Sequence, residues 1–129
     1  MGYRSEVKIA VYGDNEKFDK YVDSVLSVDA LKAADAEYLL NEDRDFASLT
    51  ITQLNEHEKI AVLEFRDIKW YESYPDIQLF ERFYLEAEEN GLNSEYARVG
   101  ESHDDNEVVQ YGDDLRYVLD IDRSVRLEF

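Results

Sequence analysis

Histidine is the side chain best suited to proton transfer and zinc binding near neutral pH, and this sequence has only two, His57 and His103. They are far apart in the chain, and neither lies in an HxxxH or HExxH pattern. The chain has no cysteine, which excludes thiolate zinc sites and thiol nucleophiles. The sequence therefore predicts no metal site built on histidine or cysteine, and both histidines are interpreted as exposed side chains in polar turns.

The oxygen-rich segment at residues 101–107, which includes Asp104 and Asp105, is the other place where a metal could bind. Carboxylate and amide oxygens are the ligands of calcium and magnesium. The segment fails the EF-hand template, because it lacks the central glycine at the right offset and the distal glutamate. A solvated acidic loop is the favoured interpretation, and a hard-cation site stays open as the alternative. In the first case Asp104 and Asp105 are candidate contacts for a partner protein.

Carboxylates able to act as acids or bases are abundant, with 31 aspartates and glutamates, so no pair among them is a specific catalytic signal. The five glycines form neither a phosphate-binding loop nor a dinucleotide fingerprint, and no GxSxG pattern occurs. We therefore predict no catalytic residues and no cofactor.

Aromatic side chains gather at Trp70, Tyr71 and Tyr74, at a junction between a predicted strand and a predicted helix. Tryptophan and tyrosine are frequent anchors of protein interfaces. Packing against the core is the favoured interpretation of the three rings, and binding of a partner is the alternative.

Two arginines, Arg4 and Arg98, offer a different chemistry, because a planar guanidinium binds phosphate or carboxylate with two hydrogen bonds. Ion pairs across strands explain them most simply. A small anion pocket formed by Arg4 and Arg98 is the alternative, and it would suit a ligand-binding or hydrolytic domain.

The formal charge of −17 restricts the partners of the whole chain. Residues 71–129 carry 16 of the acidic side chains and 5 of the basic ones. Such a field repels nucleic-acid phosphates and anionic membranes, and it attracts proteins with a basic surface. No segment approaches the roughly 20 apolar residues that a membrane span needs. We expect no direct binding to nucleic acid or membrane.

The elements that must position these residues can be predicted from their apolar periodicity. The sequence predicts strands over 6–12, 47–54, 60–70, 94–99, 108–111 and 115–121, the last with a possible extension through Val125 and Leu127. It predicts a helix capped by Asp14, a weaker helix over 29–40, and a helix capped by Ser73 and ended by Asn90-Gly91. These elements predict one α+β domain over residues 1–129, with an antiparallel or mixed sheet of five to six strands and two to three helices on one face.

Three glutamates, Glu86, Glu88 and Glu89, fall in the last turns of that predicted third helix. Negative charge there opposes the helix dipole, at about 0.3–1 kcal/mol per group. Their position makes them candidates for partner binding.

Three stretches of the sequence resemble a family of small proteins encoded by tailed phages and prophages: Gly2-Tyr3-Arg4-Ser5-Glu6-Val7, Lys69-Trp70-Tyr71 and Arg98-Val99-Gly100-Glu101. The family has no established activity or catalytic residues, so the resemblance implies only a context, the cytoplasm of an infected bacterium.

The leading functional hypothesis follows from this context, the charge and the lack of catalytic motifs. It is a noncatalytic accessory protein that binds and inhibits a host protein with a basic surface, a defence or nucleic-acid-processing factor. Its carboxylates would stand in place of DNA phosphates. The arginine-lined anion pocket and a role in the virion or its assembly are the alternatives. The oligomeric state is left open.

Overall fold

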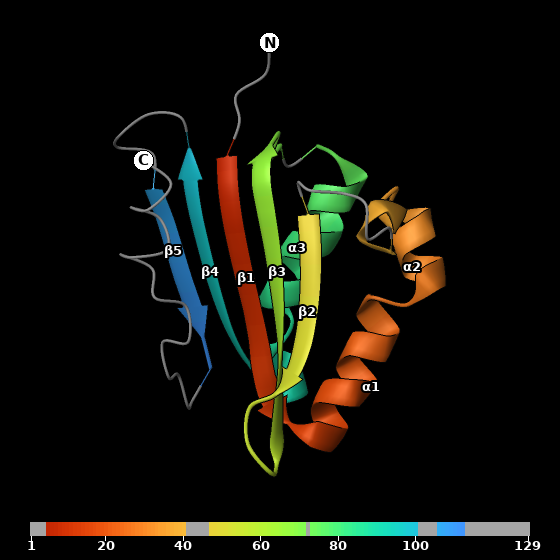
Figure 1. The fold of residues 1–129 in the computed structure, drawn as a ribbon, viewed down its shortest axis with the longest axis vertical. Coiled ribbons are helices and arrows are strands. Elements are labelled where there is room, and N and C mark those ends of the chain that lie inside the picture. Colours follow the sequence, from red (N-terminus) through yellow and green to blue (C-terminus); the bar gives the residue numbers. More distant parts are fainter. Residues whose placement is uncertain (1–4, 41–46, 72, 101–105, 113–129) are drawn as a thin grey trace.

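The computed structural model describes residues 5–40, 47–71, 73–100 and 106–112. Five strands form one antiparallel sheet in the order β2-β3-β1-β4-β5 (Figure 1). They are β1 (Ser5–Asp14), β2 (Ala47–Gln53), β3 (Glu58–Ile68), β4 (Asn93–Gly100) and β5 (Asn106–Tyr111). The strands predicted up to residue 111 are therefore confirmed, while those predicted at 115–121 and through Val125 and Leu127 lie outside the described residues.

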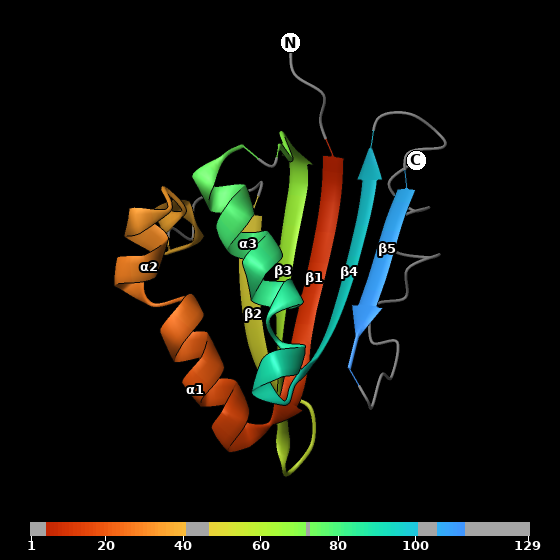
Figure 2. The same cartoon turned by 180° about the vertical axis from the view of Figure 1, so that it is seen from behind.

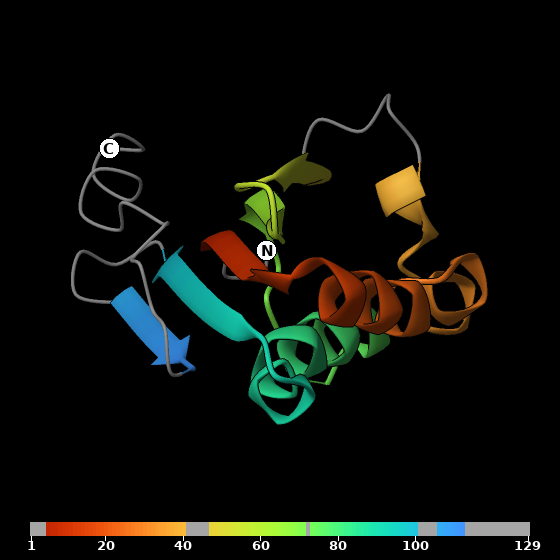
Figure 3. The same cartoon turned by 90° about the horizontal axis from the view of Figure 1, so that it is seen from below.

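Helices cover one face of this sheet (Figures 2 and 3). The helical layer contains two helices. The first is bent and consists of α1 (Asn15–Val25) followed by α2 (Val28–Ala33), and the second is α3 (Pro75–Leu85). Two short 3-10 turns, η1 (Glu37–Leu40) and η2 (Glu88–Asn90), follow α2 and α3. The predicted α+β class, with an antiparallel sheet and helices on one face, is confirmed. None of the described helices has the length and apolar character needed to cross a membrane.

The central strand β1 explains why the layers pack as they do. Val7, Ile9 and Val11 are fully buried and join the main core beneath the helices. The alternate residues Ala10 and Tyr12 point to the opposite face, where they form a smaller apolar cluster with residues of β3 and β4. Both faces of β1 are thus buried from Ile9 to Gly13, while Glu6 and Lys8 near its start are only partly buried.

The first helix begins as predicted. The side chain of Asp14 accepts hydrogen bonds from the backbone N–H groups of Glu16 (3.1 Å) and Lys17 (3.2 Å), as an N-cap does. On its buried side the ring of Tyr21 stacks on Phe83 of α3 at a centroid distance of 5.5 Å. The Tyr21 hydroxyl also donates a 2.6 Å hydrogen bond to the backbone carbonyl of Phe83, so α1 and α3 are joined by both packing and a polar contact.

The continuous helix predicted over 29–40 is wrong. The chain leaves the helix after Ala33, and Asp35 adopts a left-handed conformation with φ 56°. Aspartate tolerates this conformation better than most residues, since its short polar side chain can satisfy nearby backbone groups. The turn buries Ala36 completely and lets Leu31 enter the core.

The boundaries predicted for the third helix are also wrong. Its N-cap is Tyr74 rather than Ser73, with no side-chain hydrogen bond, and Pro75 occupies the first helical position. The helix ends at Leu85 rather than at Asn90-Gly91. A tighter 3-10 turn replaces the last predicted turn, because the N–H of Asn90 donates to the carbonyl of the buried Ala87 and the N–H of Gly91 to that of Glu88, both at 3.0 Å. Gly91 makes this turn possible with its left-handed φ of 77°.

Candidate acidic binding pocket

An acidic pocket of about 260 Å³ lies at the end of the sheet where β1 leads into α1 and the β2–β3 hairpin turns (bottom of Figure 1). Its volume falls just below the range of about 300–1,000 Å³ typical of drug-sized ligands, so it suits a single side chain or a small ion. It is lined by Gly13, Asp14, Glu58, Glu88, Gly91, Leu92, Asn93 and Gly112.

Three acidic residues from three separate segments line this pocket: Asp14 at the end of β1, Glu58 at the start of β3, and Glu88 in η2. The sheet register places Asp14 directly opposite Glu58. Like charges at opposed positions of two strands destabilise the pair. The acidic charge of the pocket is therefore maintained against its electrostatic cost.

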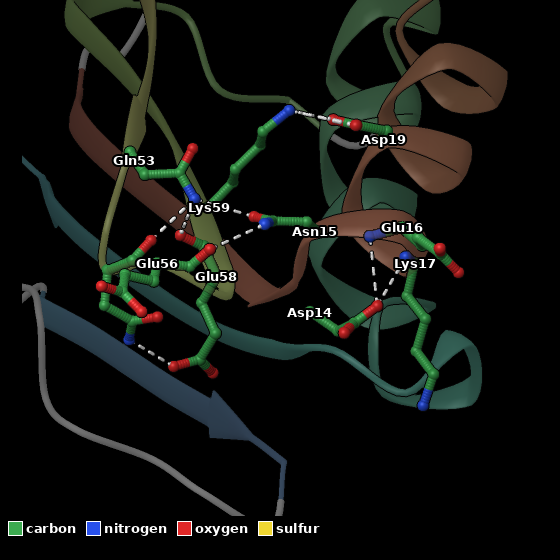
Figure 4. Close-up of polar contacts among 10 residues, drawn as sticks. Asp14, Asn15, Glu16, Lys17, Asp19, Gln53, Glu56, Glu58 and Lys59 are labelled. Carbon is green, nitrogen blue, oxygen red and sulfur yellow. Dashed lines mark hydrogen bonds and ion pairs between the residues drawn. The ribbon is translucent and has the colours of Figure 1, made fainter.

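Hydrogen bonds fix two of these carboxylates. The capping bonds described above hold Asp14 through one oxygen, Oδ2. Oε1 of Glu58 accepts a 2.6 Å hydrogen bond from Nδ2 of Asn55 in the hairpin turn. Figure 4 shows both side chains at the junction of the hairpin and α1. A carboxylate held in place loses less side-chain entropy when it binds a cation.

The hairpin itself is tied to the first helix through Asn15. The backbone N–H of Asn15 donates to the carbonyl of His57 at 2.9 Å, and its Oδ1 accepts from Nε2 of Gln53 at 2.9 Å (Figure 4). Nε2 of Gln53 also donates to the backbone carbonyl of Glu58 at 3.0 Å. These bonds couple the segments that carry Asp14 and Glu58, so the two carboxylates keep a fixed relative position.

Glycine shapes the floor of the pocket. Gly13 has φ 157°, and a Cβ atom at this position would lie 2.6 Å from Cδ2 of Leu92, which is too close. The absence of a side chain at residue 13 therefore lets the β4 segment approach β1, and the carboxylates stand around this contact.

None of the residues that line the pocket is basic. The nearest lysine of the hairpin, Lys59, is already paired with Asp19 on α1, with an Nζ–Oδ1 distance of 2.8 Å. Within the described part of the chain no group of three or more histidine, cysteine or acidic side chains has an arrangement suited to a metal. Lys17 of α1 lies beside the pocket, with its Nζ 3.1 Å from the position that a Cβ atom would take at Gly91. The charged residues of the lining itself are all acidic, so the chemistry that matches the lining is an organic cation, an ammonium or a guanidinium.

The predicted glutamates lie close to this pocket, but not in the arrangement expected. Glu88 and Glu89 are both exposed in η2, but of the two only Glu88 lines the pocket, and Glu86 is the C-cap of α3. The prediction that all three oppose the dipole of α3 is wrong, since Glu88 and Glu89 belong to the first turn of η2. Glu86 instead lines a separate, shallow hollow of about 330 Å³ beside α3 and lies 4.0 Å from Nε of Arg82.

Burial and the negative charge of Glu86 both affect the pKa of Tyr21. Burial raises the pKa of its phenol above the usual value of 10, and the charge of Glu86 raises that pKa further. Arg82 acts in the opposite direction. The charge of Glu86 thus acts on a tyrosine that is buried between α1 and α3.

The predicted aromatic anchors lie at the other end of α3. Trp70 packs against the core, with its ring 5.3 Å from that of Phe65. Its Nε1 is buried and has no hydrogen-bond partner in the part of the chain that the structure describes. Tyr71 and Tyr74 contact each other edge to face at 5.3 Å, and 39% of Tyr74 is exposed. The structure therefore does not bring the aromatic group together with Glu88.

The remaining predicted residues stay apart from the pocket. Arg98 lies on β4, where its Nη1 donates to Oγ of Ser5 at 3.3 Å and its Cα partner on β5 is Glu107. The side chain of Arg98 thus makes a hydrogen bond to β1, and the ion pair across strands stays a prediction. Arg4, Asp104 and Asp105 lie outside the described residues, so the structure gives no geometry for an Arg4–Arg98 pocket or for the 101–107 loop.

Sequence reasoning missed Asp14 and Glu58 as binding residues. Both residues fall in predicted turns, Asp14 as a helix cap and Glu58 at the end of the hairpin turn. They become neighbours only through the pairing of β1 with β3, and the register of that pairing cannot be read from the sequence.

Comparison of the chain with family models, with curated proteins and with solved structures finds no match. The function must therefore be argued from the geometry of the acidic pocket and the charge of the chain.

Proposed function

We propose that this protein is a noncatalytic binding protein whose acidic pocket receives a lysine or arginine side chain from a basic surface of another protein. The observation that carries the proposal is a pocket lined by Asp14, Glu58 and Glu88 and by no basic residue. Two of the carboxylates are held by hydrogen bonds, which favours a specific contact over general attraction.

The net charge of −17 supports the same proposal at longer range. Complementary charge accelerates association and orients the partner, while the buried contact determines affinity. Salt at physiological concentration screens charges beyond about 8 Å, so the long-range attraction alone would not select one partner. The pocket supplies the short-range contact that such selection needs.

The resemblance of three short stretches to small phage and prophage proteins supports a cellular setting. In that setting the protein acts in the cytoplasm of an infected bacterium and inhibits a host protein with a basic surface. A host factor that binds nucleic acid suits this role, because carboxylates can occupy the positions of phosphates on its surface.

Affinity capture from bacterial lysate with matched charge variants tests the proposal. The variant Glu58→Gln/Glu88→Gln removes two negative charges from the pocket, and Asp23→Asn/Glu107→Gln removes two from exposed positions elsewhere. The wild type and the second variant should retain the same basic partner, while the pocket variant loses it. Equal retention by both variants, or equal loss, would refute a role for the pocket.

A further inference from the structure

The strand β2 lies at one end of the sheet order, and among the described residues its only strand partner is β3. Every other residue of such a strand directs its backbone N–H and C=O away from the sheet. In the described residues no backbone hydrogen bond is found on the outer side of Ala47–Gln53.

Natural proteins usually protect an exposed edge with charge, proline, a bulge or a covering element. The register between β2 and β3 is continuous from Ala47 to Gln53, so there is no bulge. Residues 47–55 contain no charged side chain and no proline, and they belong to the longest uncharged run of the sequence, 46–55. In a chain of which 35% of residues are charged, the lack of a protecting charge on this edge is unusual.

No described helix or strand covers the side chains in the second half of β2. Ala47 is buried and Leu49 is partly buried against the core. Thr50, Ile51, Thr52 and Gln53 are all exposed, which means that both faces of the strand are open there. Ile51 is 47% exposed although it lies on the same side of the strand as Leu49. An added strand would cover Ile51 as well as the open backbone groups.

Charge around the edge decides which kind of strand fits. Glu64 on β3 is the Cα partner of Ser48, and Glu56 and Glu58 lie at the hairpin where β2 ends. Lys59, the cation at the same end, is paired with Asp19, and Arg66 on β3 lies 3.7 Å from a carboxylate oxygen of Glu64. A second copy of this chain would bring another charge of −17 to the same place, whereas a basic strand would be attracted.

From the uncovered, uncharged edge and the carboxylates around it, we infer that β2 accepts an extended basic segment of a partner protein as an additional strand of the sheet. Backbone hydrogen bonds to β2 hold the segment, one apolar side chain covers Ile51, and basic side chains face the acidic hairpin at Glu56 and Glu58. The inference rests on the proposed function in one respect, since it takes the partner to be a basic protein. It adds the binding mode and a surface separate from the pocket.

Titration of the full chain with a synthetic peptide tests this inference. The peptide alternates lysine and valine over seven residues, the length of β2, and the readout is amide chemical shift and amide hydrogen exchange by NMR at about 0.15 M salt. The expected result is saturable binding that slows exchange within Ala47–Gln53. Methylation of the peptide amides along one edge should abolish binding, and methylation along the other edge should not.

Two matched variants locate the binding surface. Ile51→Lys is expected to weaken peptide binding by at least about tenfold, because it places a like charge on the edge. Val108→Lys makes the same change on β5, the strand at the other end of the sheet, at a residue with a similar exposure of 45%, and should change binding by less than about twofold.

Each contrary outcome has a definite meaning. Absence of saturable binding at millimolar peptide, or equal effects of the two lysine variants, would overturn the inference. Self-association of the chain with protection of the β2 amides would also overturn it, in favour of a second copy. The pocket variant Glu58→Gln/Glu88→Gln separates the two proposals. Peptide protection of β2 that survives it, together with unchanged partner capture, would reject the pocket and leave the edge.

Discussion

The phenolic oxygen of Tyr12 donates a 2.7 Å hydrogen bond to Oε2 of Glu95, and both side chains are fully buried between β1 and β4. They lie beside a small apolar cluster on the sheet face opposite the helices. A buried carboxylate is costly unless hydrogen bonds compensate for the loss of water. This pair therefore fixes the register of β1 against β4, and with it one wall of the acidic pocket.

Tyr12→Phe should lower the free energy of unfolding by about 1–3 kcal/mol, because it leaves the buried carboxylate without this donor. Urea denaturation of the wild type and the variant measures the effect. Tyr74→Phe serves as the control at an exposed tyrosine and should stay within about 0.5 kcal/mol of the wild type. Equal stability of all three proteins would show that the Tyr12–Glu95 bond contributes nothing.

Substitutions of Asp14 should separate its capping role from its charge. Asp14→Ala removes the acceptor of two backbone N–H groups and should cost about 0.5–2 kcal/mol of stability, whereas Asp14→Asn retains an N-cap oxygen and should cost much less. Thermal unfolding followed by circular dichroism compares the two variants. A loss of stability as large for asparagine as for alanine would mean that the charge, rather than the cap, stabilises α1.

Glu58→Gln should leave the free energy of unfolding unchanged or raise it by up to about 1 kcal/mol, since it removes the repulsion with Asp14 across the strands. The amide keeps an oxygen that can accept from Asn55. Denaturation at low and high salt is the measurement, with Glu56→Gln in the exposed hairpin turn as the matched control. Marked destabilisation by Glu58→Gln alone would identify the carboxylate as structural and weaken its assignment to binding.

Stability should fall at alkaline pH because of three buried tyrosines. Burial raises the pKa of Tyr21, Tyr38 and Tyr96 in the folded protein, and the carboxylate of Asp76, which accepts a hydrogen bond from Tyr38, raises the pKa of Tyr38 further. Above pH 10 the unfolded chain releases protons that the folded chain keeps, so the stabilisation present below pH 10 is lost progressively as the pH rises.

Absorbance of tyrosinate and circular dichroism, recorded together against pH, check this prediction. Tyr96→Phe should make the alkaline loss of stability less steep, since it removes one of the three groups. Ionisation of all ten tyrosines near pH 10 without unfolding would contradict it.

Much of the fold could be predicted from local pattern. The alternation of Val7, Ile9 and Val11 predicted β1, and Asp14 followed by apolar residues at helical spacing predicted α1, because in both cases the residues that decide the structure are neighbours in the chain. The ends of the helices could not be predicted in the same way. The sequence of residues 86–90 favours a helix, yet burial of Ala87 and the left-handed turn at Gly91 end α3 early.

The candidate site depended still more on contacts between distant segments. Glu88 was selected from the sequence for its charge, but its neighbours Asp14 and Glu58 come from other strands. Only the pairing of β1 with β3 brings these residues together. The same limitation applies to Glu95, whose burial opposite Ala10 and hydrogen bond with Tyr12 follow from the pairing of β1 with β4 rather than from its own surroundings in the sequence.

The most direct test of the central claim is an NMR titration of the full chain with Nα-acetyl-arginine amide, with the uncharged citrulline analogue as the control. The account predicts amide shift changes concentrated at the residues around the pocket, including Gly13, Asp14, Glu58, Gly91 and Asn93, for arginine only. These changes should disappear in Glu58→Gln/Glu88→Gln and persist in Asp23→Asn/Glu107→Gln. Weak shifts spread evenly over the acidic residues, alike in both variants, would contradict the claim that this pocket binds a cationic side chain.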